Sequence, residues 1–195
     1  MTTIYLAGPE VFLPDAPAIM AEKRRLARAH GFEPTGPGSD ENQAPQHPAS
    51  GGVLTADAIY RRNDLAMRRA DICLANITPF RGISADPGTV YEIGFMIALE
   101  KRVWAYSNHP ADYGTRVVED WYRGAALDRS DGRPRGPDGL AVEDHGMADN
   151  LMIDGGIAAT GGRLLRAAAL PADPARDLAT YAAALAALAE AVAKG

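Results

Sequence analysis

Short apolar runs recur along this chain, each bounded by polar or turn-forming residues. They cover Thr3–Ala7, Ile72–Ile77 and Val103–Tyr106. Runs of this length with so few polar positions are typical of strands that a parallel sheet buries on both faces. The sequence therefore predicts a largely parallel sheet that is covered by helices on both sides.

Between and after these runs, the apolar residues change to a spacing of three and four, which predicts amphipathic helices. The predicted helices run from Pro14 to His30, Asp57 to Arg69, Pro87 to Glu100, Gly146 to Ala159, and from Asp173-Pro174 to about residue 194. Gly31 is expected to end the first helix, and Asp57 to cap the second. Strands alternating with helices predict an α/β fold. We expect one domain over residues 1–195, with a doubly wound, mostly parallel sheet of the Rossmann or flavodoxin-like kind.

Three segments depart from this regular alternation. Residues 107–146 contain the polar, turn-forming stretch 131–139 and are interpreted as an irregular, partly mobile insertion. Residues 36–52 are rich in Gly, Pro, Ser and Asn, and are expected to form a long loop near the functional site. Residues 163–170 fit either a further strand or the start of a helix.

The last helix carries its larger apolar residues on one stripe. These residues are Leu178, Tyr181, Leu185, Leu188 and Val192. The stripe covers barely two heptads, so the helix is expected to pack on the protein's own sheet rather than form a coiled coil.

Composition narrows the partners and the compartment. A formal net charge of −5 over 195 residues gives no electrostatic reason to expect nucleic acid or an anionic membrane as a partner. Basic clusters at 23–25, 61–62 and 68–69 fall in predicted helices and are expected on solvated faces. The single cysteine, Cys73, excludes an internal disulfide and fits a reducing compartment. Since neither a signal peptide nor a membrane-spanning run is recognisable, a cytoplasmic protein is predicted.

Two acids at one strand-to-helix junction are the first candidates for chemistry. Asp86 stands directly before Pro87, which marks a helix start, and Glu92 follows in the second turn of that helix. In an open α/β sheet, ligands bind at the carboxyl ends of the strands, where this junction lies. One carboxylate there can attack or stabilise a positive charge while the other serves a leaving group. Capping alone also explains Asp86, and an ordinary solvated helix position also explains Glu92.

Further candidates lie on neighbouring elements. Asp64 stands late in the second predicted helix, where an ion pair with an arginine of the same helix is the alternative explanation. Tyr5 and Phe12 flank the turn at Gly8. Their rings can stack on a planar ligand, and the Tyr5 hydroxyl can orient a carboxylate, although both residues also fit a role as core aromatics.

Other common types of site find no support in the sequence. Residues 7–11 lack the glycine spacing of a dinucleotide fingerprint, no GxxxxGK phosphate loop occurs, and Ser84 has no GxSxG context. The four histidines stand at no metal-ligand spacing, so no metal site is predicted. Carboxylate chemistry is left as the leading interpretation.

Several pieces of this sequence, taken in order, resemble the nucleoside 2-deoxyribosyltransferase family. They are residues 4–12, 63–65, 70–72, the long stretch from 76 to 82 and 86 to 95, and residues 149–153. Together they span most of the chain from residue 3 to about 155, and such a series in family order is more specific than any single piece.

The resemblance implies a role for each matching residue. Glu92 matches the family's nucleophile, which attacks C1′ of the deoxyribose on the face opposite the base. Tyr5 matches the aromatic residue whose hydroxyl positions that carboxylate. Asp64 and Asp86 match the acids that hold the base and help to protonate it as it leaves. Neither a metal nor an organic cofactor is required by this chemistry.

The remaining matches concern substrate binding and assembly. Phe12 matches a residue of the base-stacking wall, and Gly8 lies in the substrate-binding turn beside it. Asn150 matches a residue that reaches the sugar hydroxyls from a neighbouring subunit. The resemblance thus implies a homo-oligomer with shared sites, acting on deoxynucleosides and free nucleobases.

Three activities are compatible with these residues. The leading one is transfer of 2-deoxyribose between bases by a retaining double displacement. The second is hydrolysis of 2′-deoxynucleoside 5′-monophosphates with the same Glu92, for which Ser84, Thr89 and the first amides of the Glu92 helix could bind the phosphate. The third is a nucleoside-binding or sensor domain without catalysis.

Overall fold

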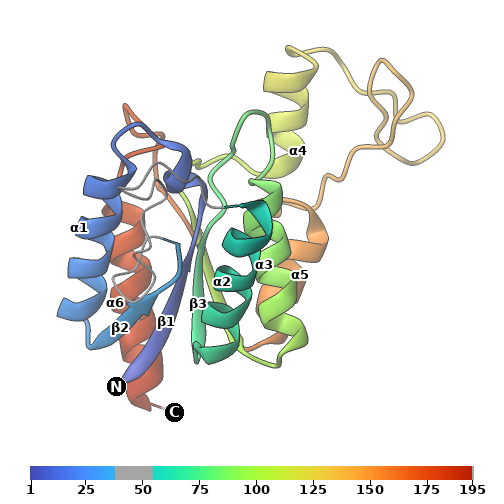
Figure 1. The fold of residues 1–195 in the computed structure, drawn as a ribbon. Coiled ribbons are helices and arrows are strands. Elements are labelled where there is room, and N and C mark those ends of the chain that lie inside the picture. The colour runs from blue at the N-terminus through green and yellow to red at the C-terminus, as the bar shows by residue number, and fades with distance from the viewer. Residues whose placement is uncertain (38–54, 195) are drawn as a thin grey trace.

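The computed structural model describes residues 1–37 and 55–194, so most of the loop expected at 36–52 falls outside the described residues. Within them, five strands form one sheet in the order β2-β1-β3-β4-β5, and every neighbouring pair is parallel (Figure 1). The strands are β1 (Thr2–Ala7), β2 (Phe32–Thr35), β3 (Ile72–Asn76), β4 (Arg102–Ser107) and β5 (Leu164–Arg166). The predicted doubly wound sheet is confirmed, with the flavodoxin-like strand order.

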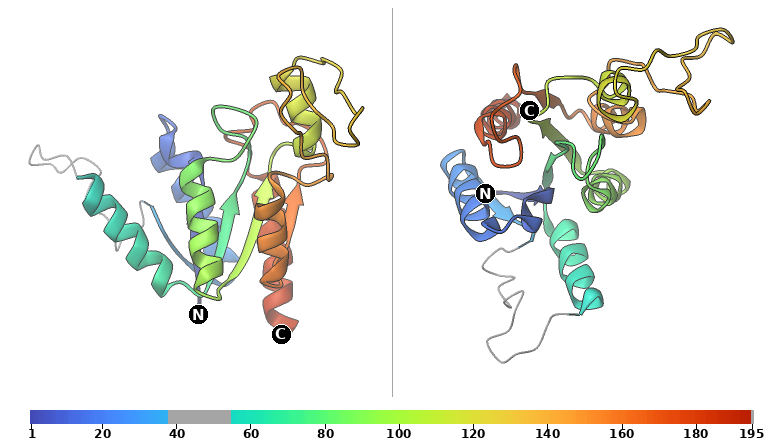
Figure 2. Two further views of the ribbon diagram at one scale, coloured as in Figure 1. Left: turned by 90° about the vertical axis from the view of Figure 1, so that its right-hand side faces the viewer. Right: turned by 90° about the horizontal axis from the view of Figure 1, so that it is seen from above.

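Helices cover both faces of the sheet, as the two views of Figure 2 show. One face carries α1 (Ala16–Ala29) and α6 (Ala179–Lys194), and the other carries α2 (Ala56–Arg69), α3 (Pro87–Ala98) and α5 (Leu151–Ala159). Short helical turns follow two of the strands: η1 (Pro9–Phe12) after β1, and α4 (Tyr113–Arg116) with η3 (Val117–Trp121) after β4.

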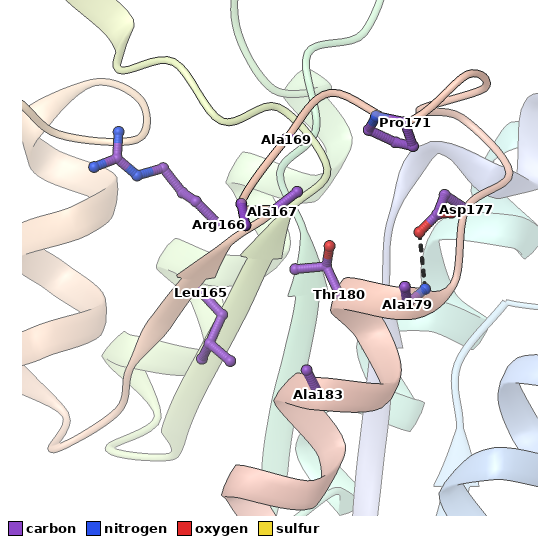
Figure 3. A pocket seen from close by; sticks show the side chains of 10 residues that line it. Leu165, Arg166, Ala167, Ala169, Pro171, Asp177, Ala179, Thr180 and Ala183 are labelled. Carbon is purple, nitrogen blue, oxygen red and sulfur yellow. Dashed lines mark hydrogen bonds between the residues drawn. The ribbon is translucent and has the colours of Figure 1, made fainter.

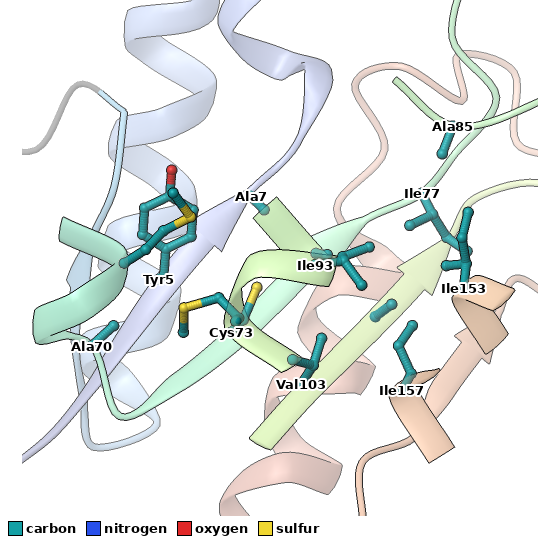
Figure 4. Close-up of a cluster of buried hydrophobic side chains, with 14 of the residues drawn as sticks. Tyr5, Ala7, Ala70, Cys73, Ile77, Ala85, Ile93, Val103, Ile153 and Ile157 are labelled. Atoms are coloured by element: carbon teal, nitrogen blue, oxygen red, sulfur yellow. The ribbon is translucent and has the colours of Figure 1, made fainter. Parts of the chain in front are cut away.

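Each face of the sheet has its own apolar core. The core under α3 and α5 includes Ile77, Ile93, Val103, Ile153 and Ile157 (Figure 4). The core under α1 and α6 includes Leu6, Leu74, Trp104, Tyr181 and Leu185. Every residue of β3 is buried because helices cover this strand from both sides. The apolar stripe of the last helix packs on the protein's own sheet, as predicted.

The sequence prediction misses one strand, β2. This strand lies at the edge of the sheet, pairs only with β1, and consists of Phe-Glu-Pro-Thr. A proline cannot donate to a central ladder but is tolerated at an edge, where the N–H is not needed by a neighbour. Pro34 therefore conceals the strand in the sequence without preventing it in the fold.

Three predicted helix starts are wrong by several residues or by the identity of the cap. Thr55, not Asp57, caps α2: its hydroxyl accepts a hydrogen bond from the amide of Ala58, while Asp57 lies in the first turn. Helix α5 begins at Leu151 rather than near Gly146, because Asn150 provides the cap. Helix α6 begins at Ala179 rather than at Asp173-Pro174, where the chain instead forms a separate turn.

The segment predicted as an insertion is irregular, and its beginning is structured. Residue 107 still belongs to β4, and α4 and η3 follow. Beyond η3, isolated bridges join Asp128 to Arg135 and Arg135 to Ala141. This part protrudes from the sheet's carboxyl edge at the upper right of Figure 1. The undecided stretch 163–170 contains the short edge strand β5. In the described part of the chain, no helix is long and apolar enough to cross a membrane.

Candidate functional site

The site is set by the point where the sheet's connections diverge. After β1 the chain turns to α1 on one face, whereas after β3 it turns to α3 on the other. The connections that leave these two adjacent strands therefore run to opposite faces of the sheet, and such a switch point is where open α/β sheets bind ligands. Both predicted acids of the strand-to-helix junction, Asp86 and Glu92, lie on the α3 side of it.

Glu92 is joined directly to Tyr5. The Tyr5 hydroxyl, at the end of a fully buried side chain of β1, donates a hydrogen bond of 2.5 Å to Oε1 of Glu92. Glu92 itself is half-buried in the second turn of α3. The structure thus brings together two residues that lie far apart in the sequence, and it places the carboxylate away from bulk water.

The surroundings make this glutamate unusually basic. Burial raises the pKa of Glu92, and the negative charge of Asp86 adds to the effect, while the Tyr5 hydrogen bond opposes both, leaving the pKa at about 7. Burial and the Glu92 charge raise the pKa of Tyr5, so the phenol stays a neutral donor. A carboxylate that titrates near neutrality in a partly dry position is suited to nucleophilic or acid–base chemistry.

Asp86 is both a helix cap and an electrostatic neighbour of Glu92. Its Oδ2 accepts hydrogen bonds from the Thr89 amide at 2.9 Å and from the Thr89 hydroxyl at 3.1 Å. The side chain is buried, and the predicted cap before Pro87 is confirmed. Because both bonds end at Oδ2, Oδ1 is not occupied by the capping interaction.

The turn after β1 brings Gly8 and Phe12 to the same edge. A Cβ atom at Gly8 would lie 2.1 Å from Oε2 of Glu10, so a larger residue would have to displace this buried carboxylate. Phe12 is more than half exposed and stacks on Phe80 with ring centroids 5.2 Å apart. The guanidinium of Arg81 lies 4.7 Å from the centroid of the Phe80 ring. Phe80 and Arg81 were not singled out from the sequence, since nothing there marks a loop Phe-Arg pair as stacked.

Asp64 and Asn150 are engaged elsewhere in the single chain. Asp64 forms an ion pair with Arg68, one helical turn further along α2, with a shortest separation of 2.9 Å. Asn150 caps α5 by accepting a hydrogen bond from the amide of Met152, and its side chain donates to Glu143 at 2.9 Å. No described contact joins either residue to Glu92, and their substrate-binding roles remain predictions.

The prediction that Lys23 lies on a solvated face is wrong. Its side chain is fully buried and forms an ion pair of 2.5 Å with Oε1 of Glu10. The same oxygen accepts hydrogen bonds from Asn76 and Tyr106. This network lies on the α1 and α6 face, opposite Glu92. The sequence offered one signal: Lys23 occupies an apolar-stripe position of its helix, next to Met20.

Three of the polar groups proposed for a phosphate already donate hydrogen bonds within the protein. The Ser84 hydroxyl donates to Asp149 at 2.5 Å, and the Thr89 hydroxyl and amide both donate to Asp86. Pro87, the first residue of α3, has no N–H to offer. The carboxylate of Asp86 thus occupies the helix terminus where a phosphate would bind. Among the described residues, no group of three or more His, Cys, Asp or Glu side chains is placed to hold a metal ion.

Two hollows lie at the sheet's carboxyl edge, and neither Asp86 nor Glu92 lines them. One, of about 410 Å³, lies between β5 and the start of α6, with an alanine-rich wall (Figure 3). Another, of about 270 Å³, lies between the turn after β1 and the loop after β3. Phe80 lines this second hollow, which therefore adjoins the stacked Phe12–Phe80 pair.

A flavodoxin-like sheet with a tyrosine-held glutamate at its switch point fits an enzyme of the deoxyribosyltransferase class. The family model described as nucleoside 2-deoxyribosyltransferase matches residues 4–152, and the chain belongs to this family. The resemblance inferred from the sequence is thereby confirmed, while the finer assignment of substrate and reaction is not contained in it.

Individual proteins resemble this chain over most of its length. A 2-desoxiribosyltransferase from Leishmania mexicana has a similar structure, with 29% identity and a TM-score of 0.58; the match covers 78% of this chain and 85% of that one. A conserved protein from Enterococcus faecalis V583 shares the fold at 21% identity, with a TM-score of 0.51 over 86% of this chain and 92% of that one. An uncharacterised protein of Schizosaccharomyces pombe is 28% identical over 169 residues, covering 82% of this chain and 78% of that protein.

Proposed function

We propose that this protein transfers 2-deoxyribose from a 2′-deoxynucleoside to a second nucleobase through a deoxyribosyl ester of Glu92. The observation that carries the proposal is the hydrogen bond between Tyr5 and Glu92, which holds a carboxylate with a pKa of about 7 at the sheet's switch point. The family supplies the class of reaction. The half-buried carboxylate of Glu92 is a group that can act as the nucleophile in this reaction.

The chemistry proceeds in two displacements. The ionised Glu92 attacks C1′ on the face opposite the base; the C1′–N bond breaks, its electron pair leaves with the base, and an ester bond forms. A second base then attacks C1′ from the side that the first one left and the ester bond breaks, which releases the carboxylate unchanged. The N–H proton of the incoming base returns to the acid that protonated the first base. Two inversions give net retention, by analogy with retaining glycosidases.

The leaving base requires a proton, which we assign to Asp86. The protonated acid donates from Oδ1, which the helix cap does not use. A positioned general acid contributes about 10²–10⁴-fold in rate. Asp64 and the Phe12 ring would hold the base, beside the turn at Gly8. Asn150 would reach the sugar of a neighbouring subunit in a homo-oligomer.

Nucleosides fit the site better than nucleoside monophosphates. Ser84 and Thr89, the groups that could have bound a 5′-phosphate, donate to Asp149 and Asp86 instead. Bringing a phosphate beside Asp86 would place two anions at one helix terminus. Both observations support the transferase over the monophosphate hydrolase.

Product analysis tests this choice. The purified protein is incubated with 2′-deoxyinosine, with and without free adenine. Transfer predicts that deoxyadenosine forms in the presence of adenine. Free deoxyribose released at the same rate with or without adenine, or activity on monophosphates alone, would contradict it. No release of base from any substrate would favour a non-catalytic nucleoside-binding protein.

Intact mass spectrometry tests the covalent step itself. With a deoxynucleoside and no acceptor, the expected result is an adduct of one deoxyribosyl group that peptide mapping places on Glu92. The Glu92→Gln variant should show no adduct. An adduct on another residue would overturn the assignment of the nucleophile.

A further inference from the structure

A buried arginine ties the predicted insertion to the rest of the protein. Arg116, at the end of α4, is 1% exposed and donates three hydrogen bonds to backbone carbonyls. They join Nε to Ile83 at 2.9 Å, Nη1 to Ala111 at 2.7 Å, and Nη2 to Ala148 at 2.7 Å. The guanidinium thus connects the loop after β3, the start of its own segment, and the residues before α5.

Asp149 completes the connection. This carboxylate is 1% exposed and lies 3.4 Å from Nη2 of Arg116. It accepts hydrogen bonds from the Ser84 hydroxyl at 2.5 Å and from the Ala85 amide at 2.9 Å. It also accepts one from the amide of Asn150 at 2.8 Å. The Arg116–Asp149 pair therefore fixes the two residues that immediately precede Asp86.

Few other hydrogen bonds hold the loop before Asp86 in place. Between residues 80 and 85 the backbone makes one internal hydrogen bond, from Phe80 N–H to the Ser84 carbonyl, in the described structure. Arg116 and Asp149 supply the described hydrogen bonds from this stretch to other parts of the chain. A shift at Ala85 would pass directly to Asp86.

We propose that Arg116 and Asp149 are positioning residues for departure of the base, acting through Asp86. The inference rests on the proposed function and gives the segment after β4 a role, which is to deliver Arg116. A misplacement of about 1 Å in a catalytic group is enough to cost on the order of 10²-fold in rate. The pair touches no reacting atom and stabilises the position of the group that does.

A substrate whose base leaves without being protonated distinguishes loss of the position of Asp86 from a general loss of stability. The purine of 7-methyl-2′-deoxyguanosine carries a positive charge and leaves as a neutral base without being protonated. Loss of the positioning pair should slow 2′-deoxyguanosine and leave the methylated substrate nearly unaffected. A variant that merely loosens the whole protein should slow both substrates.

The variants are Ser84→Ala, which removes one hydrogen bond to Asp149, and Arg116→Lys, which keeps the charge but not the fork. Single-turnover release of base is measured with both substrates. For 2′-deoxyguanosine we expect a loss of about 5–10-fold for Ser84→Ala, the worth of one hydrogen bond. For Arg116→Lys we expect about 10²-fold. Both variants should stay within about twofold of wild type on the methylated substrate. The matched control is Arg129→Lys, in an exposed ion pair of the same insertion.

The double variant Ser84→Ala with Asp86→Asn provides a second readout that remains valid if Arg116→Lys fails to fold. If Ser84 acts through Asp86, adding Ser84→Ala to Asp86→Asn should cost less than about twofold more. Equal losses on both substrates, or full additivity in the double variant, would overturn the inference. If the wild-type protein releases base from neither substrate, the proposed function fails and the inference fails with it.

Discussion

Two glutamates stand at the same edge of this sheet and differ in almost every physical respect. Glu10, on the α1 and α6 face, is almost fully buried against the charge of Lys23. Burial alone would raise the pKa of Glu10, but the Lys23 charge and the donated hydrogen bonds lower it. Glu92, on the α3 face, meets a neutral phenol, and burial raises its pKa to about 7.

The difference shows how a fold separates structural from reactive carboxylates. A buried charge with a cation beside it is satisfied and inert, whereas a buried charge held only by a neutral donor gains by forming a bond or taking up a proton. We therefore assign Glu10 to the support of the turn at Gly8, and Glu92 to chemistry. The following predictions test that contrast.

The largest expected effect is on turnover. Glu92→Gln should lower the rate of base release by about 10⁴-fold or more, because the ester cannot form. Binding of nucleoside should persist. The rate is measured in single turnover with 2′-deoxyinosine, and Glu100→Gln, an exposed change just beyond the same helix, serves as control. Undiminished turnover in folded Glu92→Gln protein would show that Glu92, like Glu10, has no role in the chemistry.

The next largest effect is on the free energy of unfolding and is expected for a change of Glu10. Glu10→Gln leaves the buried Lys23 without its counter-charge and should lower the free energy of unfolding by about 3–5 kcal/mol. Urea unfolding at pH 7 measures it. Glu22→Gln, which breaks an exposed ion pair of α1, the helix that contains Lys23, should produce no measurable change in the free energy of unfolding. Glu10→Gln combined with Lys23→Met should recover part of the loss. A loss no larger than that of the control would mean that Lys23 does not need Glu10.

A smaller effect of opposite sign is expected for the stability of Glu92→Gln. The pKa of Glu92 is about 7 in the folded protein and 4.5 as the ordinary value, so the folded protein loses stability as the pH rises from about 4.5 to about 7. Glu92→Gln should therefore be more stable than wild type by about 1–2 kcal/mol at pH 8.5, and the gain should vanish near pH 4. Thermal unfolding over this pH range measures it. A gain that grew toward low pH would contradict the sign.

The smallest effect is on the pH profile of Tyr5→Phe. The Tyr5 hydrogen bond lowers the pKa of Glu92, so removing it should move the acidic limb of kcat/KM from about pH 7 to higher pH, by up to about one unit. At pH 6 the rate should fall several-fold more than at pH 8.5. A limb that moved to lower pH would indicate that the phenol does not stabilise the charged form.

The fold and the residues around Glu92 could be predicted from the sequence. The buried ion pair around Glu10 could not. Apolar runs and the Asp86-Pro87 start signal depend on local chemistry, which can be read directly from the order of residues. The Tyr5–Glu92 contact was expected from the family resemblance, and from the ability of the Tyr5 hydroxyl to orient a carboxylate. In the structure, the Tyr5 hydroxyl lies 2.5 Å from Oε1 of Glu92.

The remaining features depend on contacts between distant segments. Lys23 looks like any charged helix residue until Glu10 is placed beside it from another element. Arg116 lies in the stretch that the sequence predicts to be an irregular, partly mobile insertion, yet the carbonyl groups that it binds come from three parts of the chain. Periodicity detects which face of an element is apolar, but it cannot detect a charge that a distant partner allows to be buried.

The cap of α3 has a consequence for the reaction cycle. Thr89 directs both of its hydrogen bonds to one oxygen of Asp86 and leaves the other outside the cap. In the proposed mechanism, Asp86 gains and loses its proton at Oδ1 while Oδ2 keeps the first helical turn closed. The helix that carries Glu92 would then not have to fray when its cap acts as the proposed acid, and Glu92 would keep its place from one turnover to the next.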